Sequence, residues 1–139
     1  MSGLAARLRL VITRTARRLR QQAGTELGPS QTAALATVER HGPLTPSDLA
    51  SIERVQRPTA TRIVARLEDA GLVERVADPT DGRSFTVSIT AEGRDLMNKL
   101  RTRKNAYLAR RIRRLDDEDL ATLDRAAEIL EDLLEGERR

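Results

Sequence analysis

The 139-residue chain contains no cysteine or tryptophan and only one histidine, one tyrosine and one phenylalanine. The lack of cysteine excludes a disulfide framework, a cysteine redox sensor and any zinc site built on thiolates. The single histidine, His41, cannot supply a metal site alone, and its position predicts a surface residue at the C-terminal end of a helix. With so few aromatic side chains, the core must consist of Leu, Ile, Val and Ala on packed helices, which favours a mainly helical fold.

The sequence also lacks a long apolar run and the residue patterns of common enzyme sites. Arginine interrupts the first apolar residues every two or three positions, so neither a signal peptide nor a membrane span is predicted. We therefore expect a cytoplasmic protein with no membrane partner. Nucleophile and base pairs, phosphate-binding glycine loops and carboxylate clusters are missing as well. The sequence predicts a protein that is not an enzyme, with no catalytic residues, no metal site and no cofactor.

Charge is unevenly distributed along the chain, although the net charge is only +4. Residues 1–20 contain six arginines and no acid, and residues 94–114 contain nine basic residues and one acid. Residues 115–139 reverse this, with ten acids and three arginines. The opposite charges predict that the acidic C-terminal segment lies against one of the basic segments. The arginines of residues 1–20 are interpreted as a solvated helix face rather than a nucleic-acid site.

Residues 56–71 carry the most informative pattern. Apolar residues recur there at i, i+3, i+4 and i+7, namely Ala60, Ile63, Val64 and Leu67. This spacing predicts a helix with one buried stripe. Pro58 suits the first helical turn, and Gly71 suits a left-handed cap after the last one. The opposite face holds small residues, hydroxyls and arginines instead of Glu and Lys, so it is suited to enter a groove.

The preceding residues predict two further helices. One begins near Pro29, ends at His41 and turns three apolar residues inward, namely Ala34, Leu35 and Val38. The other begins with Thr45-Pro46-Ser47-Asp48, which has the spacing of a capping box, and is expected to turn Leu49, Ala50 and Ile52 inward. Only three residues then precede the helix of residues 56–71. Two helices joined by so short a turn predict a helix-turn-helix. Its second helix would be the DNA-recognition helix, called the reader helix below.

After Gly71 the apolar period changes from 3.6 to 2. Residues 72–77 form one predicted strand, and Phe85, Val87 and Ile89 alternate with polar residues in a second. The loop of residues 78–84 contains proline and Asp-Gly turn residues, and such a loop closes a β-hairpin. A hairpin with a basic tip directly after a helix-turn-helix predicts a winged helix, whose tip can reach a minor groove.

Long helices are predicted at both ends of the chain. One face of the first helix, residues 4–23, is apolar at Leu4, Leu8, Val11, Ile12 and Leu19. Thr90 caps a long helix that ends near Arg114, and acidic residues begin a last helix. In the last helix, spacings of three and four alternate at Leu120, Leu123, Ala127, Leu130 and Leu134. Such a seam is typical of a coiled-coil-like contact and requires a partner helix.

The order of these elements resembles the MarR family of transcriptional regulators over nearly the whole chain. The residues that carry the resemblance are Leu44-Thr45, Asp48-Leu49-Ala50, Pro58 to Val64, Leu67 to Arg75, Asp78 to Arg83 and Thr90-Ala91-Glu92-Gly93. The resemblance implies a fold that is mainly α with a small β-hairpin wing, in a single domain of residues 1–139. It implies a DNA-binding head at about residues 28–90 and dimerisation helices at about residues 4–23 and 91–135.

The resemblance also implies function. The expected protein is a homodimeric regulator, a repressor on a near-palindromic DNA operator, released by a small aromatic acid or phenolic effector. The residues implied to contact DNA are Gln56, Arg57, Thr59, Thr61, Arg62, Arg66, Asp81 and Arg83. Arg62 is the expected base reader, because a guanidinium can bond two acceptors of one guanine. Arg83 matches a wing arginine that enters the minor groove, with Asp81 orienting it. The residues expected at the dimer interface are Leu8, Val11, Ile12, Leu120, Leu123, Ala127, Leu130 and Leu134.

Several alternatives remain at this point. Thr59 and Thr61 equally suit helix-start chemistry or phosphate anchoring, and Asp81 suits turn formation alone. Gln56 stands where the family commonly has a capping serine, so it either caps the helix or touches DNA. Tyr107 is either a core residue or a stacking partner for an aromatic effector. A winged-helix protein-interaction module without DNA binding is the alternative function, since residues 54–93 carry six charges of each sign.

Overall fold

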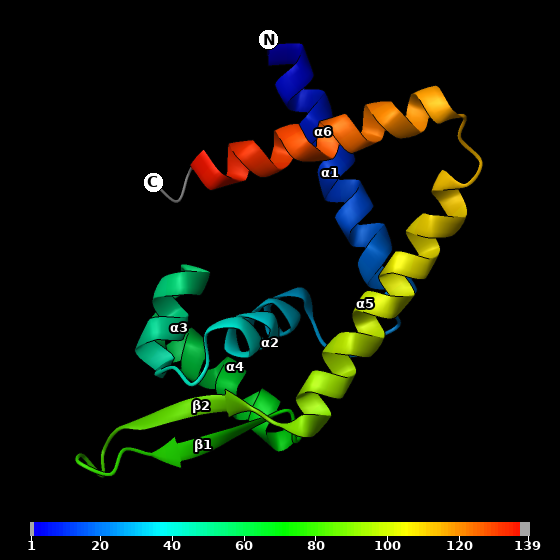
Figure 1. Ribbon diagram of the computed structural model, residues 1–139. Coiled ribbons are helices and arrows are strands. Elements are labelled where there is room, and N and C mark those ends of the chain that lie inside the picture. The colour runs from blue at the N-terminus through cyan, green and yellow to red at the C-terminus, as the bar shows by residue number, and fades with distance from the viewer. Residues whose placement is uncertain (1, 137–139) are drawn as a thin grey trace.

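The computed structural model describes residues 2–136, which form six α-helices and one two-stranded antiparallel sheet (Figure 1). In chain order the elements are α1 (Ser2–Ala23), α2 (Pro29–His41), α3 (Pro46–Glu53), α4 (Arg57–Asp69), β1 (Val73–Ala77), β2 (Phe85–Ile89), α5 (Ala91–Ile112) and α6 (Asp117–Gly136). The predicted fold class is therefore confirmed, and α5 ends two residues before the predicted Arg114. In Figure 1, α5 leads from the compact head, residues 28–90, to α6 at its far end.

The hydrophobic core lies in the head, where α2, α3, α4 and the hairpin meet. The largest side chains that are fully buried are Leu35, Val38, Leu49, Val64, Leu67, Val87 and Leu100. The predicted inward faces of α2 and α4 are confirmed, because Ala34, Ala60 and their apolar neighbours are buried and Ile63 packs against the core. Met97 and Leu100 of α5 complete this core, so the first turns of α5 belong structurally to the head.

One inward residue was predicted wrongly. Ile52 is 46% exposed, and Val55 in the following turn packs against the core instead. The inward stripe of α3 follows Pro46, Leu49, Ala50 and Glu53, which recur at i, i+3, i+4 and i+7. Ile52 lies outside that stripe, since each residue turns the helix by about 100°. Glu53 accepts a 3.1 Å hydrogen bond from the hydroxyl of Thr37, so a polar contact with α2 occupies the last inward position.

The helix ends are defined by local chemistry. The hydroxyl of Thr45 accepts the backbone N–H of Asp48 at 3.1 Å, and the carboxylate of Asp48 accepts the backbone N–H of Thr45 at 3.3 Å. The predicted capping box of α3 is therefore confirmed. Gly71 has φ +76°, which confirms the left-handed residue expected after α4. At the start of α5, Thr90 accepts the backbone N–H of Gly93 at 3.0 Å and donates its own hydroxyl to the Gly71 carbonyl at 2.7 Å.

The hairpin is paired in one continuous register, from Val73 opposite Ile89 to Ala77 opposite Phe85. Leu44, in the loop before α3, adds an antiparallel bridge to Val87, with hydrogen bonds of 3.2 and 2.8 Å. This bridge ties the middle of β2 to the helix-turn-helix. The loop between the strands projects away from the head (Figure 1).

The terminal helices are the least buried elements. Helix α1 packs against α5, but its single buried residue within the described range is Ala23 at its C-terminal end. No residue of α6 within Asp117–Gly136 is buried. The carboxylate of Asp116 accepts the backbone N–H of Asp119 at 2.8 Å, as expected for an acidic start of α6. The apolar faces predicted for both helices therefore remain uncovered in a single chain.

Candidate nucleic-acid interface

The outward face of α4 presents a row of cationic and hydroxyl side chains. Arg57, Thr61, Arg62 and Arg66 are exposed, and Thr59 is half-buried. The hydroxyl of Thr61 donates to the carbonyl of Arg57 at 3.0 Å, and the guanidinium of Arg62 donates to the hydroxyl of Thr59 at 3.4 Å. Thr61 thus uses its proton within the helix, while Thr59 holds Arg62 across the face. The arrangement leaves most guanidinium donors free for an external acceptor.

The N-terminus of α4 lacks a side-chain cap. Gln56 is the N-cap residue with extended backbone angles, and neither its side chain nor that of Thr59 makes a capping hydrogen bond. The side chain of Gln56 therefore does not cap α4 in this structure. Gln56 is exposed next to the exposed Arg57, and the first backbone N–H groups of a helix have no partner within it.

The first turn of α2 adds two polar residues that the sequence did not single out. Ser30 and Gln31 line a hollow of about 210 Å³ together with three residues of the outward face of α4, namely Thr59, Arg62 and Arg66, and with Ile63 of its inward stripe. The hollow exists because α2 packs against α4. No local pattern identifies Ser30 or Gln31, because only the packing of the two helices brings them to the reader face.

The wing loop is ordered by two aspartates. The carboxylate of Asp81 accepts the backbone N–H of Arg83 at 3.0 Å and the hydroxyl of Ser84 at 3.2 Å. Hydrogen bonds from the backbone N–H of Thr80 (2.9 Å) and from its hydroxyl (2.8 Å) hold the pKa of the Asp78 carboxyl below its ordinary value of 3.8. Asp81 therefore forms the turn, and the side chain of Arg83 at the tip is exposed.

A brace connects α4 to the wing. Arg75 on β1 pairs through Nε with the Glu68 carboxylate of α4 at 3.0 Å. Its guanidinium carbon also lies 4.5 Å from the centre of the Phe85 ring on β2. Pairing of Arg75 with Val87 places Arg75 and Phe85 on the same face of the hairpin. The side chain of Arg75 thus links both strands to the C-terminal end of α4. The sequence pattern did not reveal this contact.

Comparison with known proteins decides the family. The profile of the MarR family matches residues 27–85. An HTH-type transcriptional regulator of Mycobacterium leprae is 35% identical over 133 residues, which cover 95% of this chain and 93% of that protein. The chain belongs to the MarR family. It is a transcriptional regulator with a DNA-binding winged helix, and it is not an enzyme.

Solved structures agree with the MarR assignment. A Pseudomonas aeruginosa protein described as a transcriptional regulator is 34% identical, with a TM-score of 0.84, and the match covers 96% of this chain and 95% of that one. A MepR variant of S. aureus bound to an oligodeoxyribonucleotide shares the fold at 19% identity, with a TM-score of 0.73 over 94% of this chain and 97% of that one. Within residues 2–136, no helix is long and apolar enough to span a membrane. In the same range, no group of three or more His, Asp or Glu residues is placed to hold a metal ion.

Outside the winged helix of this MarR protein, the predicted interface residues stay exposed or half-exposed. Leu8, Val11, Ile12, Leu123 and Leu134 have exposures between 38% and 65%. Leu120 and Leu130 are half-buried, and Ala127 is exposed. The apolar faces of α1 and α6 therefore both offer surface to a partner.

Tyr107 is half-buried and lies outside the core cluster, so it is not a plain core residue. It lines a hollow of about 270 Å³ between α1 and α5, together with Arg14, Thr15, Arg18, Leu108 and Arg111. The guanidinium carbon of Arg111 lies 5.2 Å from the centre of the Tyr107 ring. The sequence left open whether Tyr107 is a core residue or a stacking partner, and the structure places arginines of both helices beside it.

Proposed function

We propose that this MarR protein is a homodimeric repressor that reads a near-palindromic operator. In this proposal α4 enters the major groove and Arg83 enters the adjacent minor groove. The observation that carries it is the exposed arginine and hydroxyl face of α4 on the same head as an exposed wing-tip arginine. The MepR variant that is bound to an oligodeoxyribonucleotide has the same fold, which supports DNA binding by this fold.

The individual contacts follow from the geometry of the reader face. Arg62 is the base reader, because Thr59 holds its guanidinium across the face and leaves donors for the two acceptors of a guanine. Arg57 and Arg66 contact phosphates at either end of the face, and Thr61 and Gln56 add polar contacts. Asp81 holds the turn from which Arg83 projects. Large apolar anchors of the kind that dominate protein interfaces are absent from the α4 face of the described head, which disfavours a protein-interaction module.

The uncovered terminal helices support the homodimer. Large apolar side chains of α1 and α6 are exposed, including Val11, Leu133 and Leu134 at 53–65%. A second copy would bury these faces, and the arginine-rich α1 would attract the acidic α6 of its partner. Two heads held in one dimer reach two half-sites about one helical turn apart, on the order of 34 Å. A dimer covering an operator that overlaps a promoter blocks transcription from it, and it works in the cytoplasm, where that DNA is.

The hollow at Tyr107 supports a small-molecule response. Arg14, Arg18 and Arg111 supply cationic donors around one aromatic ring, which suits the carboxylate and the ring of a small aromatic acid. A phenolic ligand suits the same ring. Because the hollow lies between α1 and α5, a ligand there acts on the helices that carry the heads.

The decisive experiment is DNA-binding selection from genomic fragments, followed by gel shifts with the selected duplex. Arg62→Ala should weaken specific binding roughly 5- to 150-fold, as expected for loss of a bidentate base contact. Arg83→Ala should weaken it as well, whereas Arg9→Ala, the same loss of charge at the far end of α1, should leave binding unchanged. Sedimentation should give a dimer. Failure to select any duplex, or equal binding by all three variants, would refute the assigned interface.

A further inference from the structure

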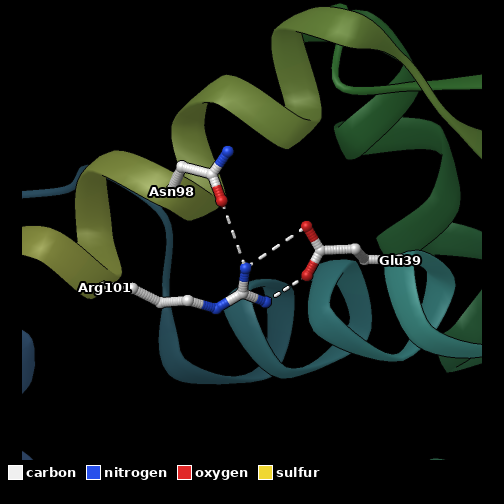
Figure 2. Close-up of polar contacts among 3 residues, drawn as sticks. All are labelled: Glu39, Asn98 and Arg101. Carbon is white, nitrogen blue, oxygen red and sulfur yellow. Dashed lines mark hydrogen bonds and ion pairs between the residues drawn. The ribbon is translucent and has the colours of Figure 1, made fainter.

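The most distinctive polar contact outside the DNA interface lies where α5 leaves the head. Leu100 is the last residue of α5 in the hydrophobic core, and Arg101 follows it directly. Both guanidinium Nη atoms of Arg101 donate to the Glu39 carboxylate of α2, Nη1 at 3.4 Å and Nη2 at closer range (Figure 2). The side chain of Glu39 is 17% exposed and that of Arg101 is 49% exposed. The contact is therefore a partly shielded two-pronged ion pair between the head and α5.

Glu39 is an unusual residue for its position. It lies in the last turn of α2, where the helix dipole favours cations such as the neighbouring Arg40. A half-buried acid there needs a compensating partner, and Arg101 supplies it. The hydrogen bond to Glu39 raises the pKa of Arg101 above its ordinary value. The Glu39 carboxylate is thus matched to one guanidinium rather than to solvent.

Two other contacts fix the direction of this guanidinium and of the junction around it. Asn98, one turn earlier on α5, accepts from Nη1 of Arg101 at 3.4 Å, on the side facing α2 (Figure 2). Two residues further along, Arg103 donates to the carbonyl of Ala23, the last residue of α1, at 2.7 Å. Arg101 and Arg103 lie about 200° apart around α5. Arg101 therefore contacts the head, and Arg103 contacts α1. The junction of head, α1 and α5 is closed by these two arginines.

Resting on the homodimer proposed above, we propose that the Glu39–Arg101 ion pair is the positioning contact that sets the direction of α5 relative to the head. It thereby fixes the separation of the two heads that an operator must match. A guanidinium that donates through two of its nitrogens to one carboxylate resists rotation, whereas a single point charge does not. Gly93, Met97 and Leu100 hold the first turns of α5 in the core, and beyond Leu100 no residue of α5 within the described chain is buried. The ion pair therefore adds a polar restraint at the point where the buried contacts end.

The absence of cysteine makes a direct test possible. Ser51→Cys places one nitroxide label per protomer on α3, where Ser51 is exposed, and pulsed electron paramagnetic resonance then gives the distribution of distances between the two heads. In this background we expect a narrow distribution for the unchanged ion pair and broad ones for Glu39→Gln and Arg101→Gln. Arg101→Lys, which keeps the charge but loses the two-pronged geometry, should broaden it too.

A charge exchange and a matched control separate positioning from simple stabilisation. Exchanging the partners, Glu39→Arg with Arg101→Glu, should restore the narrow distribution, and Arg94→Gln, two turns earlier on α5, should not change it. Thermal unfolding of each variant is measured in parallel, because a merely stabilising pair would lower Tm without altering the head separation. Glu39→Gln should also lower the affinity for the matched operator about two- to ten-fold. The variant should bind operators with altered half-site spacing as well as the unchanged protein does.

The outcomes distinguish the two proposals. No dipolar coupling in the unchanged protein would refute the homodimer, and the positioning role with it. Clear coupling whose width is the same in every variant would refute the positioning role and leave the homodimer standing. Broadening that the exchanged pair does not reverse would also overturn it, because the broadening would then not come from the loss of this charge pairing.

Discussion

Substitution of Gly93 by alanine tests the tight approach of α5 to the hairpin. A Cβ atom at this position would collide with the carbonyl oxygen of Leu72 and lie 2.7 Å from Cγ1 of Ile89. Leu72 and Ile89 are 8% and 9% exposed, so neither has free space to move. Overpacking a site of this kind costs about 1–3 kcal/mol, more than the roughly 0.5–1 kcal/mol that alanine gains over glycine in a helix. The hydrogen bond from the Gly93 N–H to the Thr90 cap would be disturbed as well.

The same substitution at Gly3 provides the control. Gly3 also lies in the first turn of a helix, but a Cβ atom added there would meet no other atom within 4 Å. Gly93→Ala should lower Tm by roughly 3–10 °C, and Gly3→Ala should leave it unchanged or raise it slightly. Thermal unfolding at equal protomer concentration measures both, since dimerisation makes Tm depend on concentration. A Gly93→Ala protein as stable as the parent would refute the close packing of α5 on the hairpin.

Three further results are expected. The lowered pKa of Asp78 means that its contribution to wing stability is present above its ordinary pKa and is lost as the pH falls through the lower folded value. The protection of the Thr80 amide, measured as its hydrogen-exchange rate relative to the intrinsic rate at the same pH, should therefore fall at acid pH, and Asp78→Asn should remove that dependence. Leu123→Glu, which places a charge on the exposed seam of α6, should give monomers by sedimentation, whereas Asp124→Glu at the exposed next position should not. Thr45→Ala should lower the free energy of unfolding by ~1 kcal/mol in urea titration, and Thr45→Ser by much less.

Much of the fold could be predicted because its signals are local. The capping box of Thr45 and Asp48 involves residues three apart, and the stripe of Ala60, Val64 and Leu67 follows from helix geometry alone. The error at Ile52 has a physical cause. In the eight-residue α3, the inward stripe takes its phase from Pro46 and ends on a polar residue, which hydrophobicity does not indicate.

The site was predictable only in part. The outward residues of α4 follow from the same periodicity that predicts its buried face. Contacts between distant residues do not: Arg101 and Glu39 are 62 positions apart, and Ser30 reaches the reader face only through the packing of α2 on α4. Likewise, Arg75 and Phe85 meet because of strand register, and no composition or spacing rule links either of them to Glu68.

The brace of Glu68, Arg75 and Phe85 has a consequence for the DNA. In the proposed DNA complex, the brace couples two prongs, the reader helix and the wing, and so favours one spacing between the major-groove and minor-groove contacts. Any misfit between the prongs and the grooves must then be absorbed by bending of the duplex. Flexible pyrimidine–purine steps absorb it more readily than stiff A-tracts. Operators should therefore be discriminated at base pairs that no side chain touches.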